Sequence, residues 1–229
     1  MTTPRVLLSW STGKDAAWTL HRLQMTGEVE VVALATTLNA AFDRVAMHST
    51  RRSVLEAQAS AAGLPLLPVN IPWPCSNDQY EAAFLCGLEE AKRLYGISHV
   101  AFGDLFLEDI RSYRDALMAR AGLLPLYPVW GLQTRDLAEE MIHSGMKAVI
   151  TCVNPAVLNR KFAGQEFDAE LISALPEGCD PCGENGEFHS CVWDGPMFQH
   201  PLSIVKGEVV ERDGFVFADV LLQSERGSE

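Results

Sequence analysis

Residues 5–25 read RVLLSWSTGKDAAWTLHRLQM, and this stretch decides the fold. The apolar run at 5–10 predicts a buried strand, and residues 16–25 predict a helix. Between them lies a turn of small and polar residues with one glycine and one lysine. Free backbone N–H groups at a helix N-terminus attract anions, so the stretch predicts a strand, a phosphate-sized turn and a helix.

Strand-like and helix-like segments alternate through the first half of the chain. We expect further strands at 28–37, 65–71 and 99–104, and helices at 48–63, 77–96 and 108–122. This alternation is typical of a parallel sheet with crossover helices. The predicted fold class is therefore α/β, with an open parallel sheet and flanking helices.

The chain changes character after a proline- and aromatic-rich stretch at 123–131. A helix at 134–145 and a strand at 146–153 precede a glycine-rich loop. Residues 201–222 then read as a hairpin that turns at RDG, 212–214. We therefore expect an α/β domain over residues 1–130 and a smaller α+β part over residues 131–229.

The 229 residues carry a net charge of −12, and this charge is distributed unevenly. Residues 1–130 hold 11 Lys/Arg and 13 Asp/Glu, whereas residues 131–229 hold 7 and 17. Such acidity argues against general nucleic-acid binding. The N-terminus lacks a signal-peptide pattern and no apolar run is long enough to span a membrane, so we expect a cytoplasmic protein with no membrane partner. The sequence does not determine the oligomeric state, and a homo-oligomer is one of the open alternatives.

The turn itself fits neither of two familiar phosphate motifs. Neither G-x-x-x-x-G-K-[ST] nor G-x-G-x-x-G occurs there. Asp15 beside a phosphate would be repelled unless a divalent cation bridges them, which hints at Mg²⁺. From the residues alone, a capped turn without a ligand explains the stretch equally well.

Four segments resemble one enzyme family. STGKDA at 11–16 resembles the S-G-G-x-D-S pyrophosphate loop of the N-type ATP pyrophosphatases. HST at 48–50, GDLFLEDIRSYR at 103–114 and DPCGENGEFHSCVWDGPMF at 180–198 extend the similarity to the diphthine–ammonia ligase family, across roughly residues 5–200. Thr12 and Ala16 depart from a Gly and from the final Ser of that motif, and the run at 108–114 differs as well.

The resemblance implies a fold, a reaction and its partners. The fold would be of the HUP-like, adenine nucleotide alpha hydrolase type. A carboxylate acceptor, on a protein side chain or a small molecule, would attack the α-phosphate of ATP with Mg²⁺ present. Pyrophosphate would leave, and ammonia would displace AMP to form an amide. The departures in the motifs leave the acceptor open.

The resemblance also implies the residues of the site. Eleven would bind ATP: Ser9, Ser11, Thr12, Gly13, Lys14, Asp15, Ala16, Thr36, His48, Gly103 and Asp104. Seven would be catalytic: Lys14, Asp15, Glu108, Arg111, Glu184, Glu187 and His189. Lys14 and Asp15, the latter with Mg²⁺, would stabilise the leaving pyrophosphate, and the last three would handle ammonia. Strand alternation predicts that Glu187 and His189 share one face.

Other interpretations remain open. The same loop would suit a related pyrophosphatase that modifies a different small molecule or a tRNA base, and Ala16 would suit a nucleotide-binding protein without catalysis. By helical spacing alone, Glu108 and Arg111 fit an ordinary solvated helix. A zinc set of Cys179, Cys182, His189 and Cys191 is a weaker alternative, because a second C-x-x-C pair is missing.

Overall fold

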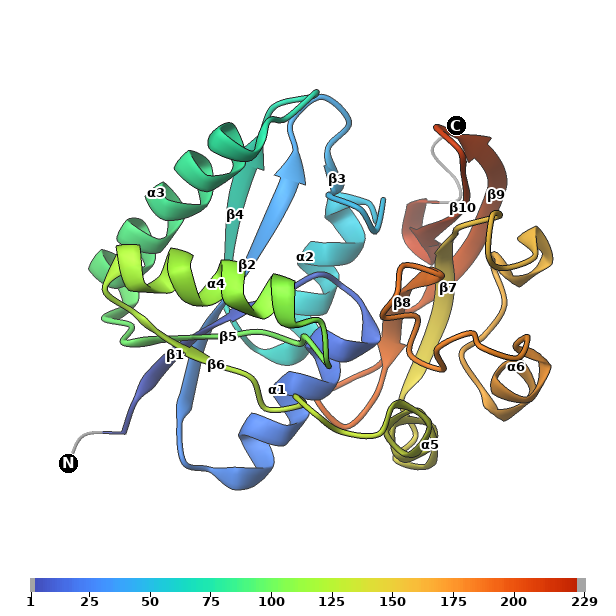
Figure 1. Cartoon of the computed structure of the whole chain (residues 1–229), viewed down its shortest axis with the longest axis horizontal. Helices are drawn as coiled ribbons and strands as arrows, with labels where there is room; N and C mark the ends of the chain where they lie inside the picture. The colour runs from blue at the N-terminus through green and yellow to red at the C-terminus, as the bar shows by residue number, and fades with distance from the viewer. Residues whose placement is uncertain (1–2, 226–229) are drawn as a thin grey trace.

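The computed structural model describes residues 3–225, which form two β-sheets and their helices (Figure 1). In chain order the elements are β1 (Arg5–Ser9), α1 (Lys14–Thr26), β2 (Glu30–Asn39), β3 (Arg44–Val45), α2 (Arg52–Ala62), β4 (Leu66–Ile71), α3 (Asn77–Tyr95), β5 (His99–Ala101), α4 (Glu108–Ala121), β6 (Leu124–Leu126), α5 (Thr134–His143), β7 (Lys147–Val153), α6 (Ala169–Ala174), β8 (Phe188–Asp194), β9 (Ile204–Arg212) and β10 (Phe215–Leu222). Two short 3-10 turns lie at Arg160–Phe162 and Gln223–Glu225.

The first sheet is parallel in the order β4-β2-β1-β5-β6, and the short β3 pairs antiparallel with the end of β2. From the central β1 the chain first builds β2 and β4 on one side, and later builds β5 and β6 on the other. The strand order therefore reverses beside β1. In open α/β sheets, ligands bind outside the carboxyl ends of the strands at such a reversal.

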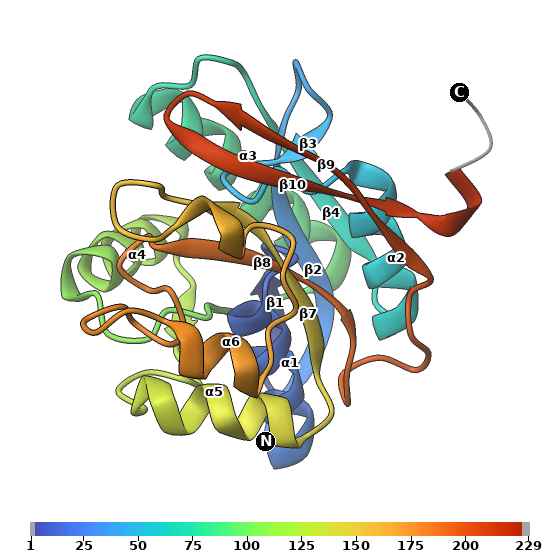
Figure 2. The same ribbon diagram turned by 90° about the vertical axis from the view of Figure 1, so that its right-hand side faces the viewer.

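The second sheet is antiparallel in the order β8-β7-β10-β9. Its hairpin turns at Asp213 and Gly214, both with positive φ, between the paired residues Arg212 and Phe215. The hairpin that the RDG sequence predicts is thus present. Figure 2 shows this hairpin passing close to β3 of the first sheet.

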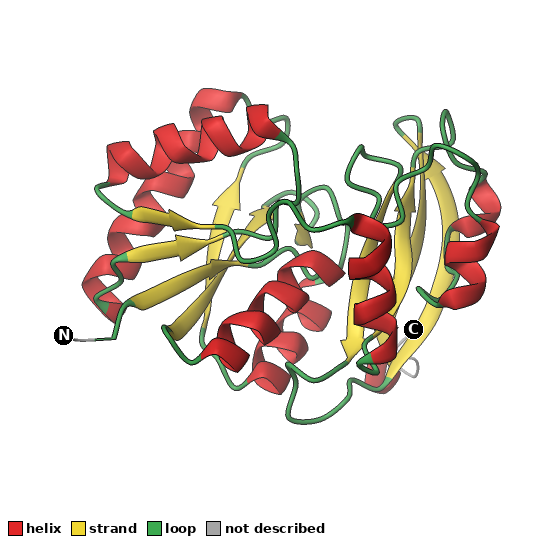
Figure 3. Cartoon of the chain, turned by 60° about the horizontal axis from the view of Figure 1, so that its bottom comes forward, coloured by secondary structure: helices red, strands yellow, loops and turns green. Residues whose placement is uncertain are grey.

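The helices form layers around the two sheets. Helices α3 and α4 cover the outer face of the first sheet, α1 and α2 lie between the sheets, and α5 and α6 pack on the second (Figures 1 and 3). One continuous core joins Leu8, Leu20, Leu55, Ile150 and Val192, which come from both sheets and the helices between them. The fold class is confirmed as α/β with a smaller antiparallel part, whereas the domain boundary near residue 130 stays a prediction.

Several predicted boundaries move, and three short elements were not predicted. The helix expected from residue 48 begins at Arg52, because Met47 and Ser49 adopt φ of 63° and 58°, outside the helical range. The strand expected to reach residue 104 ends at Ala101, and the helix expected to reach residue 145 ends at His143. The unpredicted β3, β6 and α6 have two, three and six residues, too few to show a clear period.

Among the described residues, no helix has both the length and the apolar composition needed to cross a membrane.

Candidate active site

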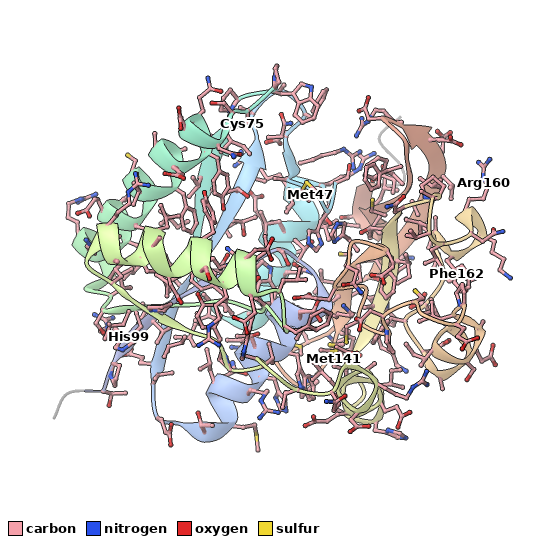
Figure 4. All side chains as sticks on the ribbon, in the orientation of Figure 1. Met47, Cys75, His99, Met141, Arg160 and Phe162 are labelled. Carbon is pink, nitrogen blue, oxygen red and sulfur yellow. The ribbon has the colours of Figure 1, made fainter. Side chains whose placement is uncertain are left out.

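A cavity of about 710 Å³ lies where the carboxyl ends of the parallel strands face the second sheet. The ends of β1, β2, β4 and β5 form one wall, and the loop at 182–186, β8 and the hairpin tip form the other. Met47 and Cys75, labelled in Figure 4, belong to its lining. Its volume is within the range typical of small-molecule sites.

The predicted phosphate turn lies at this cavity and leads into α1. Gly13 is the N-cap residue, and it has no side chain that could cap the helix end. The end of β5 approaches the first turn closely, since a Cβ added at Gly103 would lie 2.9 Å from the backbone nitrogen of Ala16. Glycine at 103 therefore allows the two backbones to meet, and the first turn of α1 opens toward the cavity where an anion can bind.

Strand β8 supports the turn from the second sheet. The backbone N–H of Val192 donates to the carbonyl of Thr12 at 3.0 Å, and the N–H of Lys14 donates to Oγ of Ser190 at 3.2 Å. The Oγ1 atoms of Thr12 and Thr50 lie 2.9 Å apart. The turn is thus held by residues that lie up to 180 positions away in the sequence.

Lys14 is buried at the base of the turn as a fixed positive charge. Its Nζ donates to the Asp15 carboxylate at 2.8 Å and to the carbonyl of Cys182, and it lies 5.4 Å from the centre of the Phe188 ring. Burial by itself lowers the pKa of Lys14, but the charge and hydrogen bond of Asp15, together with Cys182 and Glu184, outweigh it, so the pKa is raised. Lys14 therefore stays protonated and contributes positive charge beside the turn.

Glu184 brings a titratable carboxyl into the cavity. Its Oε1 accepts a hydrogen bond from the backbone N–H of Leu105 at 2.8 Å. Burial raises the pKa of Glu184 to about 7, the carboxylates of Asp15 and Asp104 add to this effect, and the Leu105 N–H opposes it. At neutral pH this carboxyl can both accept and release a proton.

Two imidazoles meet where the first sheet faces the second. The ring centroids of His48 and His189 are 4.6 Å apart, and Nδ1 of His48 lies 3.2 Å from the carbonyl oxygen of Ser190. Burial lowers the pKa of His48 to about 3 and that of His189 to about 4. Both rings are therefore neutral at pH 7. A Cβ at Gly13 would lie 2.8 Å from Cε1 of His48, so a larger residue at 13 would force this ring to shift.

Most of the predicted site residues gather at this cavity. Those that line it are Ser9, Ser11, Lys14, Asp15, Ala16, His48, Gly103, Asp104, Glu184 and His189. Thr12 and Thr36 are buried and do not line the cavity. The Thr36 hydroxyl donates to the carbonyl of Trp10 at 2.7 Å, and the neighbouring residue Thr37 lines the cavity instead. The ATP-binding and catalytic roles of these residues stay predictions.

Glu187 does not share an environment with His189, so that expectation is wrong. Glu187 precedes β8, which begins at Phe188, and is only 5% exposed. Its Oε1 accepts hydrogen bonds from the backbone N–H of Asp180 at 2.9 Å and from Nδ2 of Asn185 at 3.3 Å. The alternation assumed from the sequence does not apply before the strand starts, and Glu187 holds its own loop together.

Glu108 and Arg111 do not line the cavity. Glu108 is exposed in the first turn of α4, and the Arg111 guanidinium lies over Trp130, 4.6 Å from the centre of the ring. On the same helix, Arg114 does line the cavity, and its Nε lies 2.6 Å from Oδ2 of Asp104. Arg114 ends the GDLFLEDIRSYR segment, which points to this region of the site but does not distinguish Arg114 from Arg111.

Two further residues, Gln58 and Thr50, support the turn although neither is among the predicted site residues. Gln58 and Thr50 are fully or almost fully buried against the turn. Gln58 stands in an otherwise ordinary amphipathic helix, and a polar residue at a position facing the core is the one signal that points to it.

The donor groups fit magnesium better than zinc. Mg²⁺ in nucleotide sites is bound through one or two carboxylates together with phosphate oxygens, and Asp15 presents one carboxylate in the cavity beside the turn. Within residues 3–225, no three His, Cys, Asp or Glu side chains form a group that could hold a metal ion. The alternative zinc set fails because Cys182 Sγ donates to the Thr134 carbonyl, whereas Cys191 is buried near Gln58.

Comparison with known proteins identifies relatives over most of the chain. A family model described as the diphthamide synthase C-terminal domain matches residues 133–220. Diphthine–ammonia ligase from Bos taurus is 27% identical over 241 residues, covering 94% of this chain and 88% of the bovine protein. The protein of that name from Danio rerio is 27% identical, with 94% and 92% covered. The one from Schizosaccharomyces pombe is 27% identical, with 90% of this chain and 37% of the yeast protein covered.

The family-model match covers nearly all of the second sheet, and the pairwise matches, which cover 94% of the chain, extend into the first. The resemblance predicted from the motifs is thereby confirmed: this chain is related to the diphthine–ammonia ligases over most of its length.

Proposed function

We propose that this protein is an ATP-dependent amide-forming ligase that adenylates a carboxylate, releases pyrophosphate and AMP, and uses ammonia as the nitrogen donor. One observation carries the proposal. The open N-terminus of α1, which suits a leaving pyrophosphate, lines the same cavity as Glu184, a carboxyl that titrates near neutral pH. The names of the relatives, diphthine–ammonia ligase, support this choice of reaction.

In the first half of the reaction, a carboxylate oxygen of the acceptor attacks the α-phosphorus of ATP, and the bond from the α-phosphorus to the bridging oxygen breaks. The backbone N–H groups at the start of α1 and the charge on Lys14 would stabilise the pyrophosphate as it leaves. Asp15 would hold Mg²⁺, which when bound neutralises phosphate charge. The products of this half-reaction are an acyl-adenylate and pyrophosphate.

In the second half, ammonia attacks the acyl carbon, the bond to AMP breaks, and the nitrogen must lose a proton. Glu184 lines the cavity and is the group we assign to accept that proton. With a pKa of about 7 it is a strong enough base at neutral pH and can still pass the proton on to solvent. The neutral imidazoles of His48 and His189 face the same space without adding charge that would repel ammonium.

The acceptor is a carboxylate, and the name of the relatives makes diphthine the first candidate to test. Side chains at the outer part of the cavity include Phe42 and Trp73, whose ring centroids are 5.8 Å apart, and Arg212, which lies over Phe42. Phe42 and Trp73 are 47% and 58% exposed. This exposed aromatic rim would contact the part of the acceptor that surrounds its carboxylate.

The proposal is tested by incubating the protein with ATP, Mg²⁺, ammonium and a carboxylate acceptor, and by measuring AMP, ADP and pyrophosphate. We expect AMP and pyrophosphate in equal amounts, together with amide. Asp15→Asn should lower pyrophosphate release by about 100-fold or more, because a group stabilising the leaving charge is lost. The exposed Asp136→Asn is the matched control and should behave as the wild type. Formation of ADP, or a fully active Asp15→Asn, would exclude this chemistry.

A further inference from the structure

Gln58 of α2 is fully buried, and its side chain connects three separate parts of the protein. Its Nε2 donates to the carbonyl of Thr12 at 3.0 Å and to the carbonyl of Val192 at 2.6 Å. Its Oε1 accepts from Nε1 of Trp10 at 2.9 Å. The end of β1, the phosphate turn and β8 are therefore joined by one amide group that uses both of its N–H donors.

The turn needs such support because its backbone is in a costly conformation. Thr12 adopts φ of 72°, in the left-handed region that β-branched residues rarely occupy. The carbonyl of Thr12 receives two donors, Nε2 of Gln58 and the backbone N–H of Val192 at 3.0 Å. These two bonds fix the direction of that carbonyl toward the interior.

The direction of the Thr12 carbonyl determines what the turn offers to a ligand. In a planar trans peptide the N–H of the next residue points opposite to the carbonyl. Holding the Thr12 carbonyl inward therefore directs the N–H of Gly13 away from the core, where it makes only a 3.4 Å contact with Oγ of Ser11. Gln58 itself does not line the cavity, so it acts on the ligand site only through the turn.

We propose that Gln58 is a positioning residue that keeps the phosphate turn in the conformation that binds the pyrophosphate half of ATP. This inference rests on the proposed function for the identity of the ligand, whereas the hold on the turn follows from the hydrogen bonds alone. Without Gln58, the turn would relax away from the strained backbone, and only a fraction of the molecules would be ready to bind.

Two substitutions separate this role from a general contribution to stability. Gln58→Met keeps the size but removes the hydrogen bonds of the amide, and Gln58→Glu keeps the shape while removing the amide donors. Val54→Ala is the matched control, because Val54 is fully buried in the same helix but packs with Cys191, Leu202 and Val220 instead of the turn. It should lower the melting temperature without altering the turn.

The experiment measures amide hydrogen exchange at residues 11–16 and the affinity for Mg²⁺–ATP and for pyrophosphate. In Gln58→Met we expect faster exchange in this segment and affinities about tenfold weaker, as for a site whose competent state falls to about a tenth of the population. Gln58→Glu loses the same two donors and should show changes at least as large, so either variant that folds tests the proposal. Val54→Ala should leave exchange in this segment and both affinities as in the wild type.

Unchanged exchange and unchanged affinity in both Gln58 variants would overturn the inference. Equal losses in Val54→Ala and Gln58→Met would also overturn it, because a merely structural role would then suffice. If the wild-type protein bound neither ATP nor pyrophosphate, the proposed function would fail. Faster amide hydrogen exchange confined to residues 11–16 in Gln58→Met would then still support the inference that Gln58 fixes the conformation of the turn.

Discussion

Glu184 is the residue on which the second half of the proposed reaction depends. We predict that Glu184→Gln still releases pyrophosphate but forms amide about 100-fold to 10,000-fold more slowly, the usual effect of losing a general base. In the wild type, only the deprotonated carboxyl accepts a proton, so amide formation should fall about tenfold for each pH unit below the pKa of about 7. Rates of acceptor-dependent ATP–pyrophosphate exchange and of amide formation, measured from pH 5.5 to 8.5, test both statements.

Glu170→Gln, at an exposed position of α6, provides the matched control for this prediction and should change neither rate. Amide formation at the wild-type rate in Glu184→Gln, with an unchanged pH profile, would remove Glu184 from the mechanism.

Thr12 and Gln58 show where reasoning from single positions stops. The sequence places Thr12 in the phosphate turn, and the departure from glycine there was visible at once. The sequence does not predict that Thr12 adopts a positive φ, or that Thr50, Gln58 and Val192 hold it there. Gln58 belongs to α2, Thr50 to the segment before α2, and Val192 to β8, so all three are distant in sequence. Local patterns predict which backbone is unusual but not which distant groups hold it.

Ion pairs of Asp219 connect the hairpin of β9 and β10 to the first sheet. This carboxylate accepts from Arg44 of β3 at 2.9 Å and from Arg51, just before α2, at 2.7 Å. Partial burial works against ionisation, but the two guanidinium groups outweigh it and lower the pKa of Asp219. The hairpin tip, with Arg212 and Phe215, lines the cavity, so this contact also fixes one wall of the site.

We predict that Asp219→Asn lowers the free energy of unfolding at pH 7 by about 1–3 kcal/mol, because two partly buried guanidinium groups lose their countercharge. A group with a lowered folded-state pKa contributes stability above its unfolded-state pKa and loses it as the pH falls, so the difference should shrink below about pH 4. Urea unfolding at pH 7 and pH 3 measures it. Glu211 lies on the same hairpin and forms an exposed ion pair with Arg160 of the 3-10 turn. Glu211→Gln should therefore leave the free energy of unfolding almost unchanged. Equal effects of the two substitutions would contradict this account.

The longer elements could be predicted because their apolar periodicity or capping residues are clear, and the short ones could not. Helix α3 is bounded by a Ser76 capping box and by Gly96 in the left-handed conformation, both readable in the sequence. Strand β6 lies within the stretch that was interpreted as a boundary, because three residues that include Pro125 give no alternation. In α4, the spacing correctly predicts a helix. The spacing does not predict which face meets the cavity, because that depends on Tyr127 and Trp130, whose rings contact the Arg111 guanidinium.

The two sheets depend on each other, and acid should reveal this dependence. His48 from the first sheet's side meets His189 of β8, and each is neutral in the folded state because burial lowers its pKa to about 3 and about 4. Lys14, which also lowers both values, adds positive charge to the same region. The unfolded chain takes up protons near pH 6.5, so the folded state loses stability as the pH falls below this value.

We predict that the free energy of unfolding drops by about 2–4 kcal/mol from these two groups between pH 7 and pH 5. The double substitution His48→Gln and His189→Gln should flatten this part of the pH dependence, whereas His143→Gln, at an exposed position, should not. Urea unfolding across this pH range provides the measurement. A double variant as sensitive to acid as the wild type would show that the pair is not responsible.

The phosphate turn near the start of the chain takes its shape from residues close to the end of it. Cys182, Ser190 and Val192 all donate to or accept from the segment between Thr12 and Lys14. A chain truncated before residue 182 would contain the full nucleotide motif but would lack these three residues and their hydrogen bonds to the turn. Such a shortened chain would carry the motif without the distant groups that give the turn its shape.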